Sequence, residues 1–280
     1  MSDSLSRVLA RLLAARRRGE RLALLLDYDG TLTPLVEHPR LARLTPGTRL
    51  LLRLLAEQPG VCVGVLSGRA LDDLKGMVGL PELAYSGLSG VELELAGERS
   101  VAPGAEAGRG LVREAVDQLR VLAADYGGSW VEDKSFGLTF HYRSAAPSAA
   151  EEACSRAQDA LGRWAGRLRV VRGPKALEAT LALGRTKGTA ARAIVERVGR
   201  PVLPLYAGDG ENDRDALSAV SDLGGVPIGI GPAAPPTARY RLPSPETFVR
   251  WLRRLVLGLE RLSAYRTVSP AAPAGSGSEN

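Results

Sequence analysis

The amino-acid sequence predicts an α/β protein in which an inserted α+β domain interrupts a Rossmann-like core with a parallel sheet. Apolar segments at 22–30, 61–69 and 202–210 alternate with helical patterns, and each ends in polar residues and glycine. Continuous apolar strands that alternate with helices are typical of parallel sheets covered on both faces. The middle of the chain instead combines two helices with paired strands. We therefore expect a core of residues 1–103 and 183–265, a second domain of residues 104–182 and a disordered tail of residues 266–280.

The composition is that of an ordinary globular chain. Of the 280 residues, 45% are hydrophobic and 24% are charged, which excludes a disordered, collagen-like or disulfide-rich class. The only cysteines, Cys62 and Cys154, indicate a reducing compartment. No apolar run approaches the ~20 residues that span a bilayer. We therefore expect a cytoplasmic protein without a membrane partner.

The net charge of +6 does not by itself predict nucleic-acid binding, because the basic residues are scattered and only 5% of residues are aromatic. A solvated, arginine-rich surface is the simpler interpretation, and an anionic small substrate would also suit it. Lysine is rare, since only Lys75, Lys134, Lys175 and Lys187 occur. In such a chain a lysine is a mild indication that a compact positive charge is needed.

Periodicity predicts the first half of the core element by element. Leucine and alanine alternate with arginine at helical spacing over residues 5–20. This acid-poor segment could also be a transit peptide, but its direct continuation into a strand favours an integral helix. A strand at 22–30, a helix at 45–57, a strand at 61–69 and short strands within 82–101 follow.

The second half begins with the α+β segment. Helices at 107–125 and 147–165 flank the sequence VEDKSFGLTFHYR, and strands at 167–173 and 176–184 follow. The chain then returns to the first pattern, with a helix at 187–199, a strand at 202–210, a helix at 212–220, a strand at 226–231 and a final helix at 245–263. The last residues, VSPAAPAGSGSEN, have the composition of a disordered tail.

Four polar segments stand at or just beyond strand ends of the predicted sheet. They are Asp27-Tyr28-Asp29-Gly30-Thr31, Ser67-Gly68-Arg69, Lys187 and the sequence GDGEND at 208–213. Two carboxylates two positions apart can face one site, where one acts as nucleophile and the other as acid/base. Mg²⁺ on oxygen ligands from Asp27 and Asp209 would relieve the repulsion between a carboxylate and a phosphate dianion. Ser67 and Lys187 would complete the charge neutralisation.

Each segment alone has a simpler explanation. The aspartate pair could form a turn or helix cap, Lys187 could be a solvated helix start, and GDGEND could be an Asx-rich turn. GDGEND is not a dinucleotide fingerprint, because Asp213 stands where the third glycine would be. The four segments in this order nevertheless favour phosphoryl-transfer chemistry.

The same segments resemble the motifs of a known phosphatase superfamily. DYDGT at 27–31 resembles motif I of the haloacid dehalogenase (HAD) superfamily, and LSGR at 66–69, Lys187 and GDGENDRDAL at 208–217 look like motifs II, III and IV. The resemblance implies a Rossmannoid core with an inserted cap, Mg²⁺ dependence and an aspartyl-phosphate intermediate. It assigns the following roles: Asp27 as nucleophile, Asp29 as general acid/base, Lys187 as a catalytic cation, Ser67, Gly68 and Arg69 as phosphate-binding residues, and Mg²⁺ on Asp27, the Asp29 carbonyl and Asp209, supported by Asp213.

A narrower resemblance covers residues 22–257. LLLDYDGTLTPLVEHP, VGVLSGR, FHYR at 140–143 and GIGPAAPPTARYRLPSPETFVRWL are similar to segments of trehalose-6-phosphate phosphatases. In that family a Glu-x-Lys pair and a Lys-x-x-Glu pair of the cap grip the sugar hydroxyls. The matching residues are Glu132 with Lys134 and Lys175 with Glu178, and His141 lies in the FHYR segment. Glutamate accepts hydrogen bonds and lysine donates them, as a disaccharide requires. The alternative is that Glu132 and Lys134 form only a same-face ion pair on a strand.

Three segments depart from the family pattern. Ser89 replaces an expected histidine, Thr180 and Leu181 replace an arginine and a proline, and the motif at 208–213 reads GDGEND where GDDxTD is more common. These departures bear on the identity of the sugar and leave the phosphoryl-transfer residues intact.

The sequence therefore predicts an Mg²⁺-dependent phosphoric monoester hydrolase that converts trehalose 6-phosphate to trehalose and phosphate. One alternative is a phosphatase for a related glycosyl or pseudo-disaccharide phosphate. Another is a non-catalytic sugar-phosphate-binding protein, against which the intact Asp27, Asp29, Lys187 and Asp209 argue. The expected partner is a small sugar phosphate and not nucleic acid, while the oligomeric state stays open. His38, Arg69 and Arg143 are expected near the site without separate roles.

Overall fold

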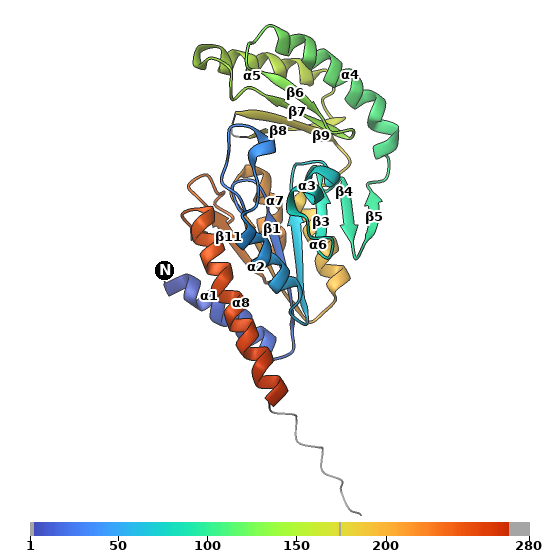
Figure 1. Ribbon diagram of the computed structural model, residues 1–280. Helices are drawn as coiled ribbons and strands as arrows, with labels where there is room; N and C mark the ends of the chain where they lie inside the picture. Colours follow the sequence, from blue (N-terminus) through green and yellow to red (C-terminus); the bar gives the residue numbers. More distant parts are fainter. Residues whose placement is uncertain (1–2, 174, 269–280) are drawn as a thin grey trace, which may run out of the picture.

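The computed structural model describes residues 3–173 and 175–268, which form two sheets in separate layers (Figure 1). The larger sheet has eight strands in the order β12-β11-β10-β1-β2-β3-β4-β5, and the smaller has four in the order β6-β7-β9-β8. The smaller sheet and its helices are inserted between β5 and α6. The predicted fold class, a Rossmann-like core with an inserted α+β domain, is confirmed.

The core sheet is parallel except at one edge. Its central strand β1 pairs in parallel with β10 and β2, while β4 and β5 add an antiparallel edge next to β3. The strand bounds are β1 (Arg21–Asp27), β2 (Val61–Leu66), β3 (Ala84–Gly87), β4 (Glu92–Leu95), β5 (Glu98–Val101), β10 (Val202–Gly208), β11 (Val226–Ile230) and β12 (Tyr240–Leu242).

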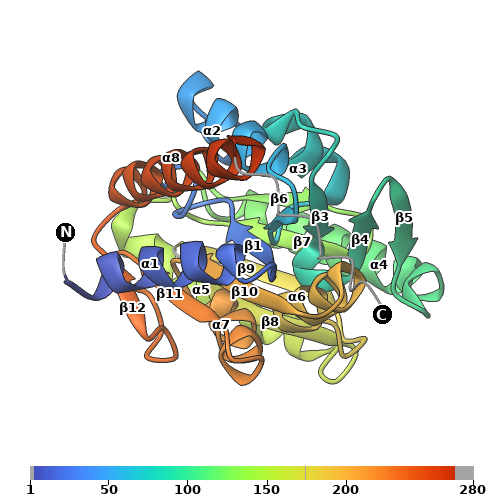
Figure 2. The ribbon, with the colours of Figure 1, turned by 90° about the horizontal axis from the view of Figure 1, so that it is seen from below.

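Helices cover both faces of this sheet, so the side chains of β1 are buried on both sides (Figure 2). Leu22, Leu24 and Leu26 join the apolar cluster under one set of helices, and Ala23 and Leu25 join the other. The first set is α1 (Asp3–Arg17), α2 (Pro46–Ala56), α3 (Leu71–Val78) and α8 (Pro245–Val268), and the second is α6 (Lys187–Val198) and α7 (Arg214–Asp222). The run of apolar residues in β1 is therefore explained by two-sided burial.

The inserted domain, which we call the cap, has its own apolar cluster. Two helices cover one face of its antiparallel sheet, and the other face is turned toward the core (Figure 1). Its elements are α4 (Ala105–Ala124), β6 (Trp130–Asp133), β7 (Gly137–His141), α5 (Pro147–Gly162), β8 (Leu168–Gly173) and β9 (Ala176–Leu181). Arg169 of β8 pairs with Asp215 of α7 at 3.1 Å, so the cap also contacts the core directly.

Two core elements were not predicted from the sequence. The helix α3 has only eight residues and includes Gly76, so its apolar spacing at Leu71, Leu74 and Val78 is a weak signal. The strand β12 has three residues, too few to show a period. Three short 3₁₀ turns, η1 (Pro39–Leu41), η2 (Leu88–Gly90) and η3 (Glu211–Asp213), also lie outside the predicted pattern.

The two ends of the chain differ in part from expectation. The segment predicted as helix or transit peptide forms α1, which packs on α8 through Trp251, whose Nε1 donates to Leu5 O at 3.3 Å. The helix α8 continues to Val268, into the predicted tail, and residues 269–280 lie outside the described part. No helix among residues 3–173 and 175–268 is long and apolar enough to cross a membrane.

Gly90 allows the η2 turn to approach the start of α6. Its φ is +105°, and a Cβ there would lie 2.5 Å from the carbonyl oxygen of Thr186. We expect Gly90→Ala to lower the free energy of unfolding in urea by about 1–3 kcal/mol, through both backbone strain and this clash. Gly97 also has a positive φ of +80° but nothing within 4 Å, so Gly97→Ala is the control for strain alone. Equal losses in the two variants would contradict the role of the close approach.

Candidate active site

A cavity of about 360 Å³ lies between the polar face of the cap sheet and the carboxyl ends of the core strands. Asp27 ends β1, Ser67 follows β2 and Asp209 follows β10, so the parallel sheet brings these residues to one edge. Every residue to which we gave a catalytic, binding or metal-ligating role lines the cavity except Lys187 and Asp213, which are buried next to Asp27 and Asp209. Of the three residues expected near the site without separate roles, Arg69 and Arg143 line the cavity and His38 does not.

Lys187, the first residue of α6, is the centre of a buried ion cluster. Its Nζ donates to Oδ1 of Asp27 at 2.6 Å and to Oδ1 of Asp213 at 2.7 Å. The side chains of Lys187 and Asp213 are completely buried, and that of Asp27 is 4% exposed. The ammonium thus compensates two carboxylates that could not be buried alone without a large loss of hydration free energy.

Asp213 holds the loop that carries Asp209. Its Oδ1 accepts a hydrogen bond from the hydroxyl of Tyr206 at 2.6 Å, and its Oδ2 accepts from the backbone amides of Asp209 and Gly210 at 2.9 and 3.1 Å. Since both oxygens are engaged, Asp213 fixes the turn after β10 and with it the position of the Asp209 carboxylate.

Burial and mutual repulsion shift the pKa values of these groups. Burial, and then the charge of Asp213, raise the pKa of Asp27 well above its ordinary value despite Lys187, and the same two causes raise the pKa of Asp209 to about 7. Burial alone would lower the pKa of Lys187, but Asp213 and Asp27 raise it above its ordinary value. The lysine is therefore a permanent cation, and the cluster carries excess negative charge when its carboxylates are ionised.

The acidic cluster fits a hard divalent cation. One oxygen from each of Asp27, Asp209 and Asp213 lies within 4.8 Å of the others. Three carboxylates and one ammonium leave two excess negative charges, which one divalent cation would balance. The Oδ2 atom of Asp27 is buried and has no hydrogen-bond partner among the described residues, so it is available as a ligand. All-oxygen donor sets of this kind suit Mg²⁺ or Ca²⁺.

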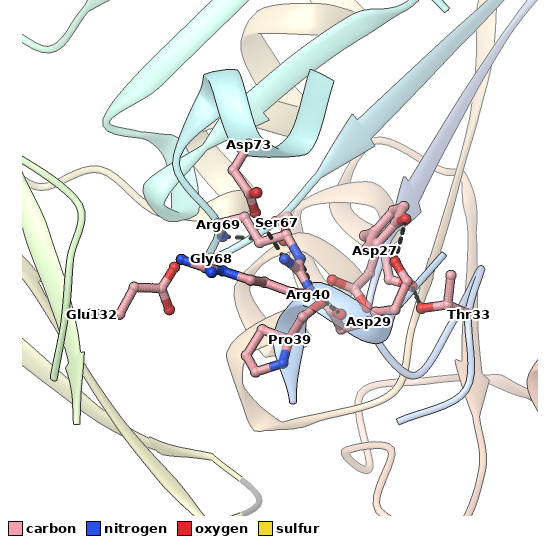
Figure 3. Close-up of polar contacts among 12 residues, drawn as sticks. Asp27, Asp29, Thr33, Pro39, Arg40, Ser67, Gly68, Arg69, Asp73 and Glu132 are labelled. Atoms are coloured by element: carbon pink, nitrogen blue, oxygen red, sulfur yellow. Dashed lines mark hydrogen bonds and ion pairs between the residues drawn. The ribbon is translucent and has the colours of Figure 1, made fainter. Parts of the chain in front are cut away.

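Asp29 does not belong to this cluster through its side chain. Its two carboxylate oxygens accept hydrogen bonds from Nε and Nη2 of Arg69 at 2.7 and 2.8 Å (Figure 3). Arg69 also donates to Asp73 at 2.8 Å and to the carbonyl of Pro39 at 2.7 Å. The arginine predicted to bind phosphate is thus largely occupied with Asp29, Asp73 and the loop at Pro39.

The turn after β2 presents a hydroxyl and a glycine to the cavity. Ser67 is buried, and its Oγ accepts a hydrogen bond from the backbone amide of Arg69 at 3.2 Å. A Cβ on Gly68 would lie 2.6 Å from a carboxylate oxygen of Glu178, so a larger residue here would displace that carboxylate from its place beside the turn.

The cap contributes a second set of charged residues. Glu132 accepts from Nε2 of His141 at 2.9 Å and lies 3.8 Å from Nζ of Lys134. Burial alone would raise the pKa of Glu132, but the hydrogen bond from His141 and the charge of Lys134 lower it to about 2. Lys134 also donates to the carbonyl of Gly68 at 3.0 Å. The same-face ion pair considered as an alternative is present, and it bridges to the core turn as well.

The second predicted pair reaches the cavity from β9 and the turn before it. Glu178 lies opposite Gly68, and Lys175 is exposed, with a positive φ of 54°. Both residues line the cavity. Glu132, Lys134, Lys175 and Glu178 therefore all lie on the cap side of one cavity, where the family resemblance led us to expect them.

Three aromatic rings join the core to the cap. The ring of His38, in the loop after β1, stacks on Trp130 of β6 with centroids 5.1 Å apart, and Trp130 stacks on His141 at 4.1 Å. Beside this stack, Nη1 of Arg143 donates to the carbonyl of Val36 at 2.6 Å. Through these contacts, His38 and Arg143 both lie at the boundary between the core and the cap.

Sequence reasoning missed Tyr206 and Trp130. A tyrosine inside an otherwise apolar buried strand has to find a partner for its hydroxyl, so Tyr206 could have been recognised as a neighbour of a polar site. Trp130 gave no such signal, because its two histidine partners lie far apart in the sequence, at positions 38 and 141.

Solved structures share this architecture. The C-terminal domain of a trehalose-6-phosphate phosphatase from C. albicans superposes with a TM-score of 0.80 over 89% of this chain and 96% of that one, at 22% identity. A phosphatase of the HAD superfamily from Bacteroides thetaiotaomicron gives a TM-score of 0.53 over 84% of this chain and 95% of that one, at 19% identity. The fold is that of the capped HAD phosphatases.

Sequence comparison narrows the class to a family. Residues 25–246 match the family model of trehalose-phosphatase, and the chain belongs to that family. It is 35% identical over 212 residues to a trehalose-phosphate phosphatase of Mycobacterium bovis, a match that covers 74% of this chain and 53% of that protein. The chain thus spans about half the length of the curated relatives that it matches.

Lys187→Met would leave Asp27 and Asp213 buried without a cation. We expect it to lower the free energy of unfolding by about 3–5 kcal/mol at pH 7, measured in urea with a chelator present. The pKa of Asp27, already raised, would rise further in the folded variant, so protonation would favour folding and the loss should shrink as the pH falls from 8 to 5.

Arg192→Met is the control, because Arg192 forms an exposed ion pair with Asp222 at 2.6 Å. Its loss should stay within about 1 kcal/mol at every pH. If the loss in free energy of unfolding of Lys187→Met did not change with pH, the proposed burial of uncompensated carboxylates would be contradicted.

Proposed function

We propose that this protein hydrolyses trehalose 6-phosphate to trehalose and phosphate, through an aspartyl-phosphate on Asp27. The observation that carries the proposal is that one cavity holds both halves of the required chemistry. Its core side presents Asp27, Asp29 and Asp209, and its cap side presents two Glu/Lys pairs. Membership of the trehalose-phosphatase family supports the same substrate.

In the first step, an oxygen of Asp27 attacks the phosphorus, and the bond between phosphorus and the sugar oxygen breaks. Asp29 gives its proton to the departing sugar oxygen, which leaves as a hydroxyl. Both oxygens of Asp29 accept hydrogen bonds from Arg69 in the structure, so this step requires the carboxyl group to leave at least one of those contacts.

In the second step, water attacks the phosphorus of the aspartyl-phosphate and gives a proton to Asp29. The bond between Asp27 and phosphorus then breaks, which releases phosphate and restores both carboxyl groups. Lys187 holds Asp27 in place through both steps and offsets part of the charge of the phosphoryl group.

We propose Mg²⁺ as the resident ion of the acidic cluster. Asp27 and Asp209 would hold it, together with the backbone carbonyl of Asp29, and Asp213 would support the loop. When bound, the ion neutralises the negative charge that opposes approach of a phosphate dianion to a carboxylate. The buried Oδ2 of Asp27 supports this assignment.

The cap residues would bind the sugar. Glu132 is ionised across the physiological range, since its pKa is lowered to about 2, and can accept hydrogen bonds from sugar hydroxyls, as can Glu178. Among the departures from the family pattern, Ser89 and Thr180 do not line the cavity, whereas residues 210–212 do. A changed sugar preference would therefore come from the GDGEND segment.

We also place the reaction in the cytoplasm, in keeping with two free cysteines.

The deciding experiment is phosphate release from a panel of sugar phosphates, with and without Mg²⁺. The proposal expects Mg²⁺-dependent turnover with a preference for trehalose 6-phosphate over glucose 6-phosphate. Preference for another glycosyl phosphate would favour the alternative substrate, and tight binding of sugar phosphates without turnover would favour the non-catalytic alternative.

Asp27→Asn should remove essentially all turnover, because an amide is a poor nucleophile and a poor metal ligand. The measurement is kcat with trehalose 6-phosphate, beside a circular dichroism melt that checks the fold. Retention of a tenth of the activity corresponds to only about 1.4 kcal/mol in barrier and would rule out Asp27 as the nucleophile.

Asp29→Asn should lose turnover of sugar phosphates but keep a burst of the first step with an activated aryl phosphate. The aryl leaving group departs without a proton, whereas a sugar oxygen needs one. Rapid-quench measurement of the phenol released in the first turnover checks whether this step survives. Equal losses with both substrates would mean that Asp29 has another role, such as holding Arg69.

A further inference from the structure

Thr139 occupies the centre of the cap face that lines the cavity. It lies on β7, directly opposite Glu132 of β6 on one side and Glu178 of β9 on the other. Directly paired residues of antiparallel strands share a face of the sheet, so the three side chains form one row. All three line the cavity.

The hydroxyl of Thr139 is buried without a protein partner. The residue is 2% exposed, and its Oγ1 has no hydrogen bond to any of the described residues. A buried hydroxyl without a partner is less favourable than the methyl group of valine, which has nearly the same shape. Because Thr139 also lines the cavity, a threonine at this position is explained best if a ligand in the cavity is the partner of its hydroxyl.

The neighbours of Thr139 define the chemistry of that partner. Glu132 is already held by His141 and Lys134, and Glu178 lies against Gly68. Both glutamates only accept hydrogen bonds when ionised, whereas a hydroxyl both donates and accepts. Strands lie about 4.8 Å apart, so the row spans about 10 Å, and a group that bridges it must offer several hydroxyls in sequence. A disaccharide does so, because its hydroxyls are spread over two linked rings.

We propose that Thr139 binds a sugar hydroxyl of the substrate through Oγ1, between the hydroxyls bound by Glu132 and Glu178, and so adds to the selectivity for a sugar phosphate. This inference rests on the proposed function, because it concerns the sugar half of the same cavity. It assigns to Thr139 a substrate contact that none of the four charged cap residues supplies, namely a neutral group that can both donate and accept.

The test compares Thr139→Val with Thr139→Ser, which keeps the hydroxyl. In the active enzyme, the ratio of kcat/KM for trehalose 6-phosphate to that for a small aryl phosphate should fall about three- to tenfold in Thr139→Val, the scale of one neutral hydrogen bond. Thr139→Ser should stay within about twofold of wild type. In an Asp27→Asn background, which removes turnover, calorimetry should give similar affinities for trehalose 6-phosphate with Thr139 and with Thr139→Ser. The affinity with Thr139→Val should be weaker.

Thr237 provides a matched control. Its Oγ1 is also buried without a partner among the described residues, but it does not line the cavity. Both Thr139→Val and Thr237→Val should melt at or above the wild-type temperature, while only Thr139→Val should lose sugar selectivity. A Thr139→Val variant with unchanged ratio and affinity would overturn the proposal and leave an internal water as the partner of Oγ1.

Failure of the proposed function has a different signature. If the wild type prefers another sugar phosphate of the panel, the proposed substrate fails, and the comparison of Thr139 variants is made with that compound. A loss in Thr139→Val then still supports the contact. If no sugar phosphate is bound or turned over, both proposals are overturned together.

Discussion

The pairing of Lys187 with Asp27 and Asp213 is the interaction on which the rest of the site depends. Those three residues come from α6, β1 and the turn after β10, so their ion cluster joins three separate parts of the core. Without the ammonium, two carboxylates could not remain charged in a buried position. Tyr206 and the amides after β10 then bind the remaining lone pairs of Asp213. The positions of Asp27 and Asp209 on the core side of the cavity thus follow from how the core compensates its buried charge.

The cap and the core present different kinds of polar groups to the cavity. The core gathers carboxylates around Lys187 and Arg69, whereas the cap presents both acceptors and donors on one face of an antiparallel sheet. Its strands are antiparallel and hydrogen-bonded in a fixed register, which holds Glu132 and Glu178 on one face. A polar surface of this kind suits a ligand with many hydroxyls, and the hydrogen bond from Lys134 to the carbonyl of Gly68 holds this surface beside the core turn that follows β2.

The sequence alone predicted the core alternation, the insertion and the convergence of Asp27, Ser67 and Asp209, because strand periodicity and parallel pairing follow local rules. It did not predict α3, in which only Leu71, Leu74 and Val78 mark the helical period, or β12, which is too short to show one. Nor could it predict that Arg69 is bound to Asp29 and Asp73, or that Trp130 lies between His38 and His141. Except for Arg69 and Asp73, which are four residues apart, these contacts join residues remote in the sequence. The packing of the core decides the contact of Arg69 with Asp29, and the packing of cap on core decides the stack at Trp130.

The loop that carries His38 belongs to the core in sequence but is shared by both domains in space. Arg69 binds it at Pro39, and Trp130 and Arg143 of the cap bind it at His38 and Val36. Exchange of the cap alone for that of a relative would therefore leave residues 36–39 facing unfamiliar partners. The natural unit of recombination in this architecture is the cap together with that short loop. This holds although some 90 residues of the chain separate the loop from Trp130 of the cap.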